Sequence, residues 1–210
     1  MAQSKTSSDE DSISSGARRI LVVAEQLFAQ KGFDAVSMNE IAVQAGVSKA
    51  NVFHHFGRKE DLYLNTLRVA CEDTAQVINE ATSSAGSFEQ RLADFIQHHL
   101  ESTLANENTT RLILRELLEH GPQHGKTLAQ QVFGDNFSSL VSLVQEGQNE
   151  GILKKDIDPA LLAVVIVSAN YFFFQTRDVL RHFSEVKFAD DTDGFSNQVI
   201  NILFNGIKND

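Results

Sequence analysis

The chain has 210 residues, of which 42% are hydrophobic, enough for one all-helical unit or for a small domain joined to a larger one. Its single cysteine, Cys71, excludes a disulfide framework and a thiolate metal site, so a reducing compartment, the cytoplasm, is expected. The formal net charge of −10 argues at first against a nucleic-acid partner.

The first 15 residues are predicted to be a disordered tail. They are rich in serine, contain the acidic run Asp9-Glu10-Asp11 and lack the apolar segment of a signal peptide. Farther along, the most apolar run, residues 160–167, is much shorter than the roughly 20 residues that a membrane-spanning helix needs. The sequence therefore predicts no transmembrane helix.

Residues 16–62 are predicted to form a small domain of three helices. The first helix covers 17–31, where apolar residues recur every three or four positions, and it ends at Gly32. A second helix runs to residue 45 from Ser37, which forms a capping box with Glu40. After a turn at Gly46, a third helix covers 48–55 and is followed by the start of a fourth at Lys59.

Residues 63–210 are predicted to form a larger helical domain, because they lack the alternation and the paired turns of strands. The predicted architecture is all-α with about nine helices in total, and the helices after the third are 59 to beyond 79, 88–104, 110–120, about 126–151, 159–182 and about 191–207. One of these helices, about 126–151, contains Gly134 and Gly147, and the sequence leaves open whether the helix bends at either glycine.

The charge is divided unevenly between these two parts. Residues 16–68 hold seven basic and five acidic residues, whereas residues 69–210 hold ten basic and twenty acidic ones. An acidic body joined to a mildly basic head is the asymmetry expected if only the head approaches phosphate.

The two short helices around Gly46 have the dimensions of a helix-turn-helix, whose second helix enters the major groove of DNA. Ser48 and Lys49 place a hydroxyl, free amides and a positive charge at the start of that helix, which suits a phosphate. Asn51 has the paired donor and acceptor that read adenine, while His54 and His55 follow one turn later. The two histidines are not expected to bind a metal, because adjacent helical residues diverge by about 100°.

The segment EQLFAQKGFDAVSMNEIAVQAGVSKANVFHHFGRKEDLY resembles the DNA-binding domain of the TetR family. The positions that match are Phe28, Gly32, Phe33, Ser37, Ile41, Ala42, Ala45, Gly46, Val47, Ser48, Val52, Phe53, His55, Phe56, Lys59 and Leu62. The resemblance implies phosphate contacts from Ser37, Ser48 and Lys59. It also implies that Lys49, Ala50, Asn51 and His54 lie in or near the groove.

Phe53 departs from the family pattern, which has tyrosine at this position with a hydroxyl that commonly reaches a phosphate. Phenylalanine can keep the packing of that ring but cannot donate a hydrogen bond. One backbone contact per subunit is therefore expected to be missing, or to be replaced by His54 or His55. The predicted DNA-binding set is Ser37, Ser48, Lys49, Ala50, Asn51, Phe53, His54, His55 and Lys59.

The resemblance also implies a dimer that binds a palindromic operator, usually represses transcription and leaves DNA when a small molecule enters the C-terminal domain. Two segments, TRLILRELLEHGP and VSANYFFFQTRD, resemble the C-terminal halves of family members that regulate pyrimidine catabolism. That likeness does not identify an effector. No cofactor is expected.

Five residues of the larger domain are predicted to form an effector site, since an aromatic-lined pocket with a few polar anchors suits a small molecule. Asn170, Phe174 and Arg177 share one helix face, and His99 and Arg115 lie on otherwise apolar helices. An arginine there would hold a carboxylate or an imide oxygen. The alternative is an ion pair, Arg115 with Glu119 or Arg177 with Glu116.

Residues 160–183 are apolar on nearly every side, so they must be buried from more than one direction. Packing against a second copy of the chain is expected, with burial inside one subunit as the alternative. The predicted interface residues are Leu161, Val164, Val165, Ser168 and Phe172 on one helix and Val199, Ile202 and Leu203 on the last helix.

Two other classes of function compete with a ligand-controlled repressor. An all-α enzyme or carrier with an incidental helix-turn-helix is one, although no catalytic triad spacing, metal pair or phosphate loop is present in the sequence. The other is an activator or a global factor that needs no ligand. The sequence predicts a regulator and no enzymatic activity.

Overall fold

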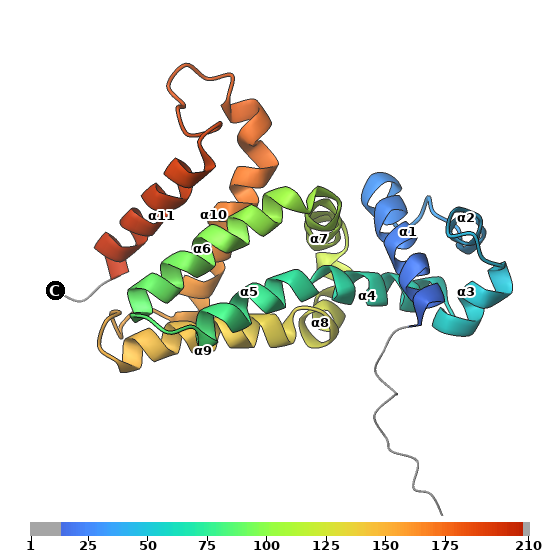
Figure 1. Ribbon diagram of the computed structural model, residues 1–210, viewed down its shortest axis with the longest axis horizontal. Coiled ribbons are helices and arrows are strands. Elements are labelled where there is room, and N and C mark those ends of the chain that lie inside the picture. Colours follow the sequence, from blue (N-terminus) through green and yellow to red (C-terminus); the bar gives the residue numbers. More distant parts are fainter. Residues whose placement is uncertain (1–13, 208–210) are drawn as a thin grey trace, which may run out of the picture. The chain divides into compact units, whose positions relative to one another are not determined.

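The computed structural model describes residues 14–207, which contain eleven α-helices and no β-strand (Figure 1). The predicted all-α class is confirmed, whereas the predicted disordered tail falls almost entirely outside these residues. The chain divides into two compact units, one ending at Thr66 and one beginning at Leu67. The predicted domain boundary, between residues 62 and 63, lies close to this division, and both fall inside one helix, α4 (Lys59–Ala70).

The N-terminal unit consists of α1 (Ser15–Lys31), α2 (Met38–Gln44), α3 (Lys49–Phe56) and the beginning of α4. α1 packs against both α2 and α3, and its fully buried Phe28 meets the ring of Tyr63 edge to face, with centroids 4.9 Å apart. Packing against α1 thus fixes the two short helices in position, although helices of seven and eight residues are too short to be stable alone.

The single helix predicted from residue 59 to beyond 79 is two helices. It breaks at Cys71, between α4 and α5 (Glu72–Ser83). Neither glycine nor proline marks this break in the sequence, so local propensity could not reveal it.

The helix predicted over about 126–151 is also two helices, α8 (Gly121–Gln131) and α9 (Gly134–Asn149). Of the two bends left open, the one at Gly134 is a break, while Gly147 lies within α9. Gly121-Pro122 does more than end α7 (Glu107–Glu119), because it forms the first turn of α8. These two breaks account for eleven helices in place of about nine.

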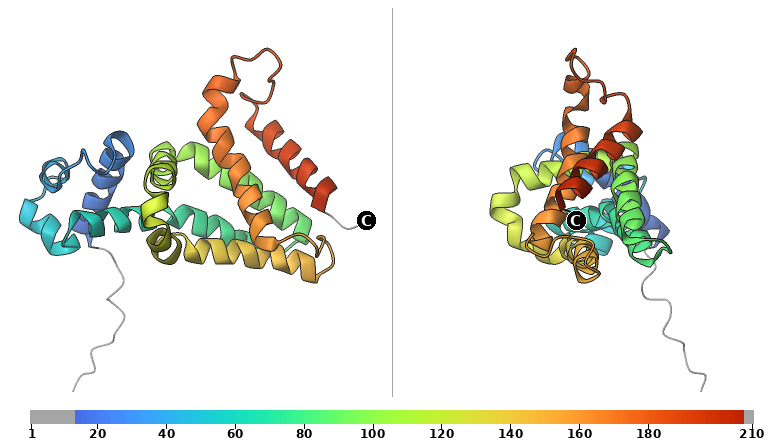
Figure 2. Two further views of the ribbon diagram at one scale, coloured as in Figure 1. Left: turned by 180° about the vertical axis from the view of Figure 1, so that it is seen from behind. Right: turned by 90° about the vertical axis from the view of Figure 1, so that its left-hand side faces the viewer.

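The core of the C-terminal unit lies between α5, α6 (Phe88–Ala105), α9 and α10 (Pro159–Leu180) (Figure 2). α6 packs against α5, α10 and the last helix, α11 (Thr192–Ile207). α5, α6 and α9 run alongside one another, and α10 crosses them. Phe88, Phe95 and Leu143 are among the side chains that fill this core.

α10 is long and apolar enough to cross a membrane, by length and composition alone. The expectation of no transmembrane helix rested on residues 160–167, a shorter apolar run within this helix, and it stays a prediction. One such helix is weak evidence for a membrane protein, because the core helix of a soluble protein meets the same criterion. Only 33% of its most apolar window is buried in the chain, so much of its surface is left uncovered.

Candidate DNA interface and ligand cavity

The turn between α2 and α3 is built by two serine caps. Ser37 Oγ accepts a hydrogen bond from the Glu40 amide at 3.1 Å, and Ser48 Oγ accepts one from the Asn51 amide at 3.1 Å. Between them, Gly46 has φ of +64°, a conformation that a side chain disfavours. Both serines are exposed, so each hydroxyl caps the N-terminus of a helix that faces solvent.

Glu40 joins α2 to α1. Its carboxylate lies 2.6 Å from Lys31 Nζ, and this hydrogen bond is the main cause that lowers the pKa of Glu40. The backbone of Ser37 lowers the pKa further, as the predicted capping box requires. Lys31 is therefore engaged within the unit rather than offered to a ligand.

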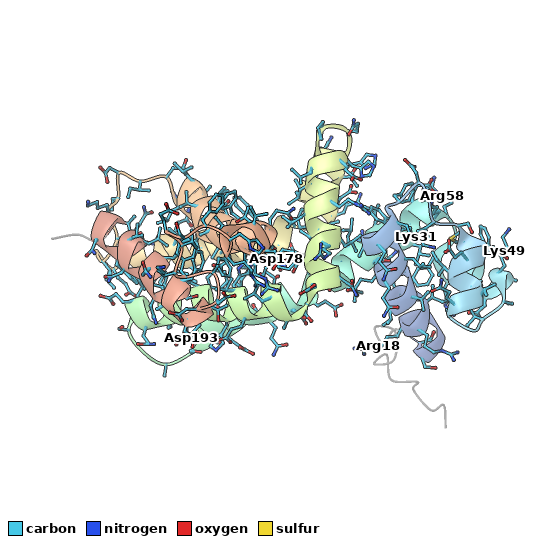
Figure 3. All side chains as sticks on the ribbon, turned by 90° about the horizontal axis from the view of Figure 1, so that it is seen from above. Arg18, Lys31, Lys49, Arg58, Asp178 and Asp193 are labelled. Atoms are coloured by element: carbon cyan, nitrogen blue, oxygen red, sulfur yellow. The ribbon has the colours of Figure 1, made fainter. Side chains whose placement is uncertain are left out.

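One face of α3 is buried and the other is exposed. Val52 and Phe56 are buried against the unit's core. The residues of the predicted DNA-binding set that are exposed on or beside this helix are Ser48, Lys49, Ala50, Phe53, His54 and His55. In Figure 3 Lys49 extends from the outer edge of the N-terminal unit, with no helix of that unit in front of it.

Asn51 differs from this exposed set. Its Oδ1 is buried without a hydrogen-bond partner. A Cβ built at Gly16 of α1 would lie 3.9 Å from that oxygen and 3.8 Å from His55 Nε2, so both side chains reach toward the beginning of α1. The expectation that Asn51 reads adenine is not supported by this geometry, because an oxygen held against α1 is not offered to a base edge.

Lys59 is half-buried and lies over the turn before α2. Its ammonium nitrogen is 4.3 Å from the centroid of the Phe33 ring and 3.5 Å from the carbonyl oxygen of Asp34, to which it donates. The long side chain covers an aromatic ring while its charge stays at the surface.

Phe53 is 44% exposed, so its ring lies at the surface of the unit and not in its core. Lys49 Nζ lies 5.7 Å from the centroid of its ring. The ring is therefore a platform on the exposed face of α3, and a hydroxyl added at its tip would meet solvent.

The C-terminal unit contains a cavity of about 400 Å³, within the range of small-molecule sites. α5, α6, α7, α9, α10 and the segments that join them contribute to its wall. The residues that line it are Cys71, Thr74, Ile78, His99, Ile113, Leu117, Phe133, Asn136, Phe137, Leu140, Val164, Val167, Ser168 and Tyr171. None of them is an acidic residue, a lysine or an arginine.

Only His99 of the predicted effector residues lines this cavity. Arg115 forms an ion pair with Glu119 at 3.3 Å, as the alternative reading held. Arg177 pairs with Glu107 at 3.3 Å and not with Glu116. The expected arginine anchor is therefore absent from the wall, because ion pairs hold both guanidinium groups elsewhere.

Phe174 and Asn170 also lie outside the wall. Phe174 is buried beneath the Arg111 guanidinium, 5.8 Å from the ring centroid. Asn170 is buried behind His99 and donates from Nδ2 to His99 Nδ1 at 3.0 Å and to the Ile96 carbonyl at 2.9 Å. Asn170 is thus a positioning residue for the histidine that does line the cavity.

The hydrogen bonds of Asn170 fix the proton on His99. The atom that faces the Ile96 carbonyl must be a donor, so the amide nitrogen is correctly placed, and His99 Nδ1 must accept from it. The ring proton is then on Nε2. Burial lowers the pKa of His99 to about 4, so the imidazole is neutral at physiological pH.

Sequence reasoning missed most of the wall. Phe133, Asn136 and Phe137 surround the break between α8 and α9. Gly134 marked a possible bend there, but the sequence did not show that this bend would border a cavity. Tyr171 belongs to an aromatic run that is more often core than pocket. Burial raises the pKa of Tyr171, and it raises the pKa of Cys71 to about 12, so both remain uncharged.

The two helices that were predicted to form the interface expose six of the eight predicted residues. Leu161 and Phe172 are 59% and 67% exposed, and Ile202 on α11 is 72% exposed. Val164, Val165 and Ser168 are exposed as well, whereas Val199 and Leu203 are half-buried against the core. Val164 and Ser168 additionally line the cavity.

Comparison with known proteins agrees with the helix-turn-helix and extends beyond it. Residues 20–66 match the family described as bacterial regulatory proteins, tetR family. Residues 89–197, about half of the chain, match the tetracyclin repressor-like C-terminal domain.

Individual relatives are similar over most of the chain. The transcriptional activator FasR of Mycolicibacterium smegmatis is 26% identical over 163 residues, covering 77% of this chain and 74% of FasR. The transcriptional repressor NicS of Pseudomonas putida is 23% identical over 172 residues, covering 81% of each chain.

A solved structure shows the same fold. The fatty acid degradation regulator FadR from Bacillus halodurans superimposes with a TM-score of 0.76 at 18% identity, covering 93% of this chain and 98% of that one. The family models, the relatives and the exposed capped helix α3 agree, and the relatives are regulators rather than enzymes. The chain belongs to the TetR family of bacterial DNA-binding transcriptional regulators.

Proposed function

We propose that this regulator binds a palindromic operator as a homodimer, represses transcription, and is released from DNA by a small-molecule effector in the bacterial cytoplasm, at the nucleoid. The observation that supports DNA binding most directly is α3, whose Ser48-capped end and outer face are exposed on a rigid three-helix unit. A helix N-terminus with exposed amides and Lys49 beside it attracts phosphate.

Ser37, Ser48 and Lys59 are the proposed phosphate contacts. Lys49, Ala50, Phe53, His54 and His55 are proposed to lie in or near the groove. Asn51 is proposed to support the start of α1, given where its oxygen lies, rather than to read a base.

The proposal of a dimer is supported by the exposed apolar face of α10. Side chains such as Leu161, Val165 and Phe172 are too exposed for a monomer to gain from their hydrophobicity. Two-fold symmetry would then place two copies of α3 for two half-sites of a palindrome. Effector control is supported by the cavity of about 400 Å³ in the same unit.

Repression is proposed in preference to activation because the C-terminal half matches a repressor-like domain. FasR is named an activator and NicS a repressor, so both kinds of regulator occur among the relatives. Transcription from the regulated promoter, measured with and without the protein, distinguishes repression from activation. An increase in transcription with the protein would contradict repression.

The salt dependence of DNA affinity tests the interface. We expect log affinity for a palindrome from the chain's own upstream region to fall steeply with log salt, by about 0.9 for each phosphate neutralised. Lys59→Ala should weaken binding to all sequences alike and reduce the slope by about one for each subunit.

Lys126→Ala, which removes an exposed lysine of the acidic C-terminal unit, is the matched control and should leave the slope unchanged. A flat salt dependence of the unaltered protein, or no binding to any palindrome, would overturn the proposal. Anisotropy of labelled DNA measures both quantities.

A further inference from the structure

The wall of the cavity in the C-terminal unit is apolar and uncharged. Aromatic and aliphatic side chains of α5, α7, α9 and α10 make up most of it, among them Ile113, Phe133 and Leu140. The polar groups that join them are hydroxyl, thiol, amide and imidazole groups. At physiological pH each of these is neutral, because burial keeps Cys71 and Tyr171 protonated and His99 unprotonated.

His99 gives this wall a hydrogen-bond donor of fixed orientation. The ring is 2% exposed and lies between Phe95 and Tyr171, whose centroids are 5.6 Å and 5.3 Å away. Asn170 occupies Nδ1 and thereby leaves the proton on Nε2. Among residues 14–207, Nε2 takes part in no hydrogen bond within the chain.

The two arginines that were predicted to anchor an effector are engaged outside the wall. Arg115 is paired with Glu119, and Arg177 with Glu107. A ligand carboxylate in this cavity would therefore lose its hydration without gaining a cation, which disfavours its entry. A ligand carbonyl or ether oxygen loses much less and can accept the proton of His99.

From this wall we infer that the effector is an uncharged, mostly apolar molecule that carries one hydrogen-bond acceptor, held by His99 Nε2–H. The inference rests on the proposed function, in which this cavity is the effector site. It replaces the expectation of an arginine-held carboxylate or imide. His99 is the specificity-determining residue, and Asn170 positions it.

Four probes separate the contributions of charge, acceptor and size. Dodecan-2-one is neutral with one acceptor oxygen, dodecanoate has the same chain with a charge, dodecane has no acceptor, and uracil is small and polar. Isothermal titration calorimetry of each with the DNA-free protein gives the affinities. We expect the ketone to bind at least about tenfold more tightly than dodecanoate, and about two- to tenfold more tightly than dodecane.

His99→Phe tests the donor while keeping an aromatic ring in place. The ketone should then lose its advantage over dodecane, with dodecane itself little affected. His98→Phe on the same helix is the matched control, because His98 is exposed and outside the wall, and it should preserve the preference. If His99→Phe does not fold, the comparison of ketone, alkane and carboxylate in the unaltered protein still decides.

Tighter binding of dodecanoate or uracil than of the ketone would overturn the inference, as would equal binding of ketone and dodecane. Binding of none of the probes would overturn it too. Because DNA binding is measured separately on ligand-free protein, intact operator binding with the wrong ligand preference contradicts this inference alone. Loss of operator binding contradicts the proposed function instead.

Discussion

Phe53 is the exposed side chain at which we expect a substitution to change DNA affinity without affecting the fold. Its ring is 44% exposed beside Lys49, so a para-hydroxyl would extend into solvent with no steric cost. Phe53→Tyr should restore the phosphate contact typical of the family and tighten DNA binding, by roughly tenfold at most for one hydrogen bond to a charged group in each subunit. Anisotropy titrations at one salt concentration measure this.

Phe183→Tyr is the control for the Phe53 prediction, since it adds the same hydroxyl to a phenylalanine that is 54% exposed in the C-terminal unit. It should leave DNA affinity unchanged. If Phe53→Tyr gives no gain, the ring does not lie near a phosphate and the register of α3 on DNA must differ from the one proposed.

His99 links one residue's protonation to the stability of the chain. Its pKa is about 4 in the folded protein and 6.5 when unperturbed, because burial disfavours the imidazolium. Between pH 6.5 and pH 4 the unfolded chain binds a proton at His99 that the folded chain does not bind. The free energy of unfolding is therefore highest above pH 6.5 and decreases as the pH falls toward 4. The two pKa values correspond to about 3 kcal/mol.

Urea denaturation at pH 7 and pH 4.5 tests this linkage. Between pH 7 and pH 4.5 we expect the free energy of unfolding of His99→Phe to decrease by about 2–3 kcal/mol less than that of the unaltered chain. The other titrating groups are common to both proteins and cancel in the comparison. His98→Phe, at an exposed position, should lose as much as the unaltered chain. Equal losses in all three would show that His99 is charged or solvated in the folded state.

At the scale of the element, the helices whose ends carry caps or glycine were predictable and the others were not. The starts of α2, α3 and α10 were predictable because each begins at a residue whose side chain can cap a helix: Ser37, Ser48 and Asp158. In the structure each of these side chains accepts a hydrogen bond from a backbone amide of its helix. The break at Cys71 has no such residue. It is specified by tertiary packing, which no local pattern reports.

The cavity was not predictable for a related reason. Its wall collects side chains from five helices and from the break between α8 and α9, so its lining depends on how helices pack. Sequence patterns do show that Arg115 and Arg177 lie on apolar helices, but not that Glu119 and Glu107 hold them outside the wall. The DNA-binding segment is local, and this is why it could be predicted in detail.

Gly147 is a glycine in mid-helix that packing requires. A Cβ there would overlap three ring carbons of the buried Phe88, the farthest of them 2.8 Å away. Overpacking costs about 1–3 kcal/mol, and alanine stabilises a helix by roughly 1 kcal/mol relative to glycine. Gly147→Ala should therefore destabilise the chain by up to about 2 kcal/mol.

Gly125→Ala is the matched helical control, because a Cβ at Gly125 in α8 would meet no atom within 4 Å. It should stabilise the chain by roughly 0.5–1 kcal/mol. Urea midpoints at constant slope give both values. A stabilising Gly147→Ala would show that Phe88 can move aside, and that α6 and α9 pack less tightly than the structure has them.

The exposed face of α10 makes a prediction about assembly. Phe172→Glu places a charge on a side chain that is 67% exposed in the monomer, so folding should survive while a hydrophobic interface should not. Sedimentation velocity should then show a monomer, and operator affinity should fall because two half-sites are no longer bound together. Leu118→Glu on α7, where Leu118 is 75% exposed, should remain dimeric. A dimeric Phe172→Glu protein would place the interface elsewhere.

At the scale of the whole molecule, the two units have different charges and different partners. The acidic C-terminal residues repel DNA phosphate, whereas residues 16–68 have a small excess of basic side chains. A ligand-controlled regulator works only if effector binding to the C-terminal unit changes the affinity of the N-terminal unit for DNA. Thermodynamic linkage makes that change reciprocal, whatever its structural route.

Reciprocity gives a test that needs no knowledge of the conformational change. If dodecan-2-one lowers operator affinity by some factor, saturating operator must lower the protein's affinity for dodecan-2-one by the same factor. Calorimetry with and without operator measures one side of the cycle, and anisotropy with and without ketone measures the other. DNA of equal length without a palindrome is the control, and it should leave ketone affinity unchanged. Release of DNA by the ketone without a matching loss of ketone affinity would mean that the ketone removes DNA by some process other than occupying this cavity.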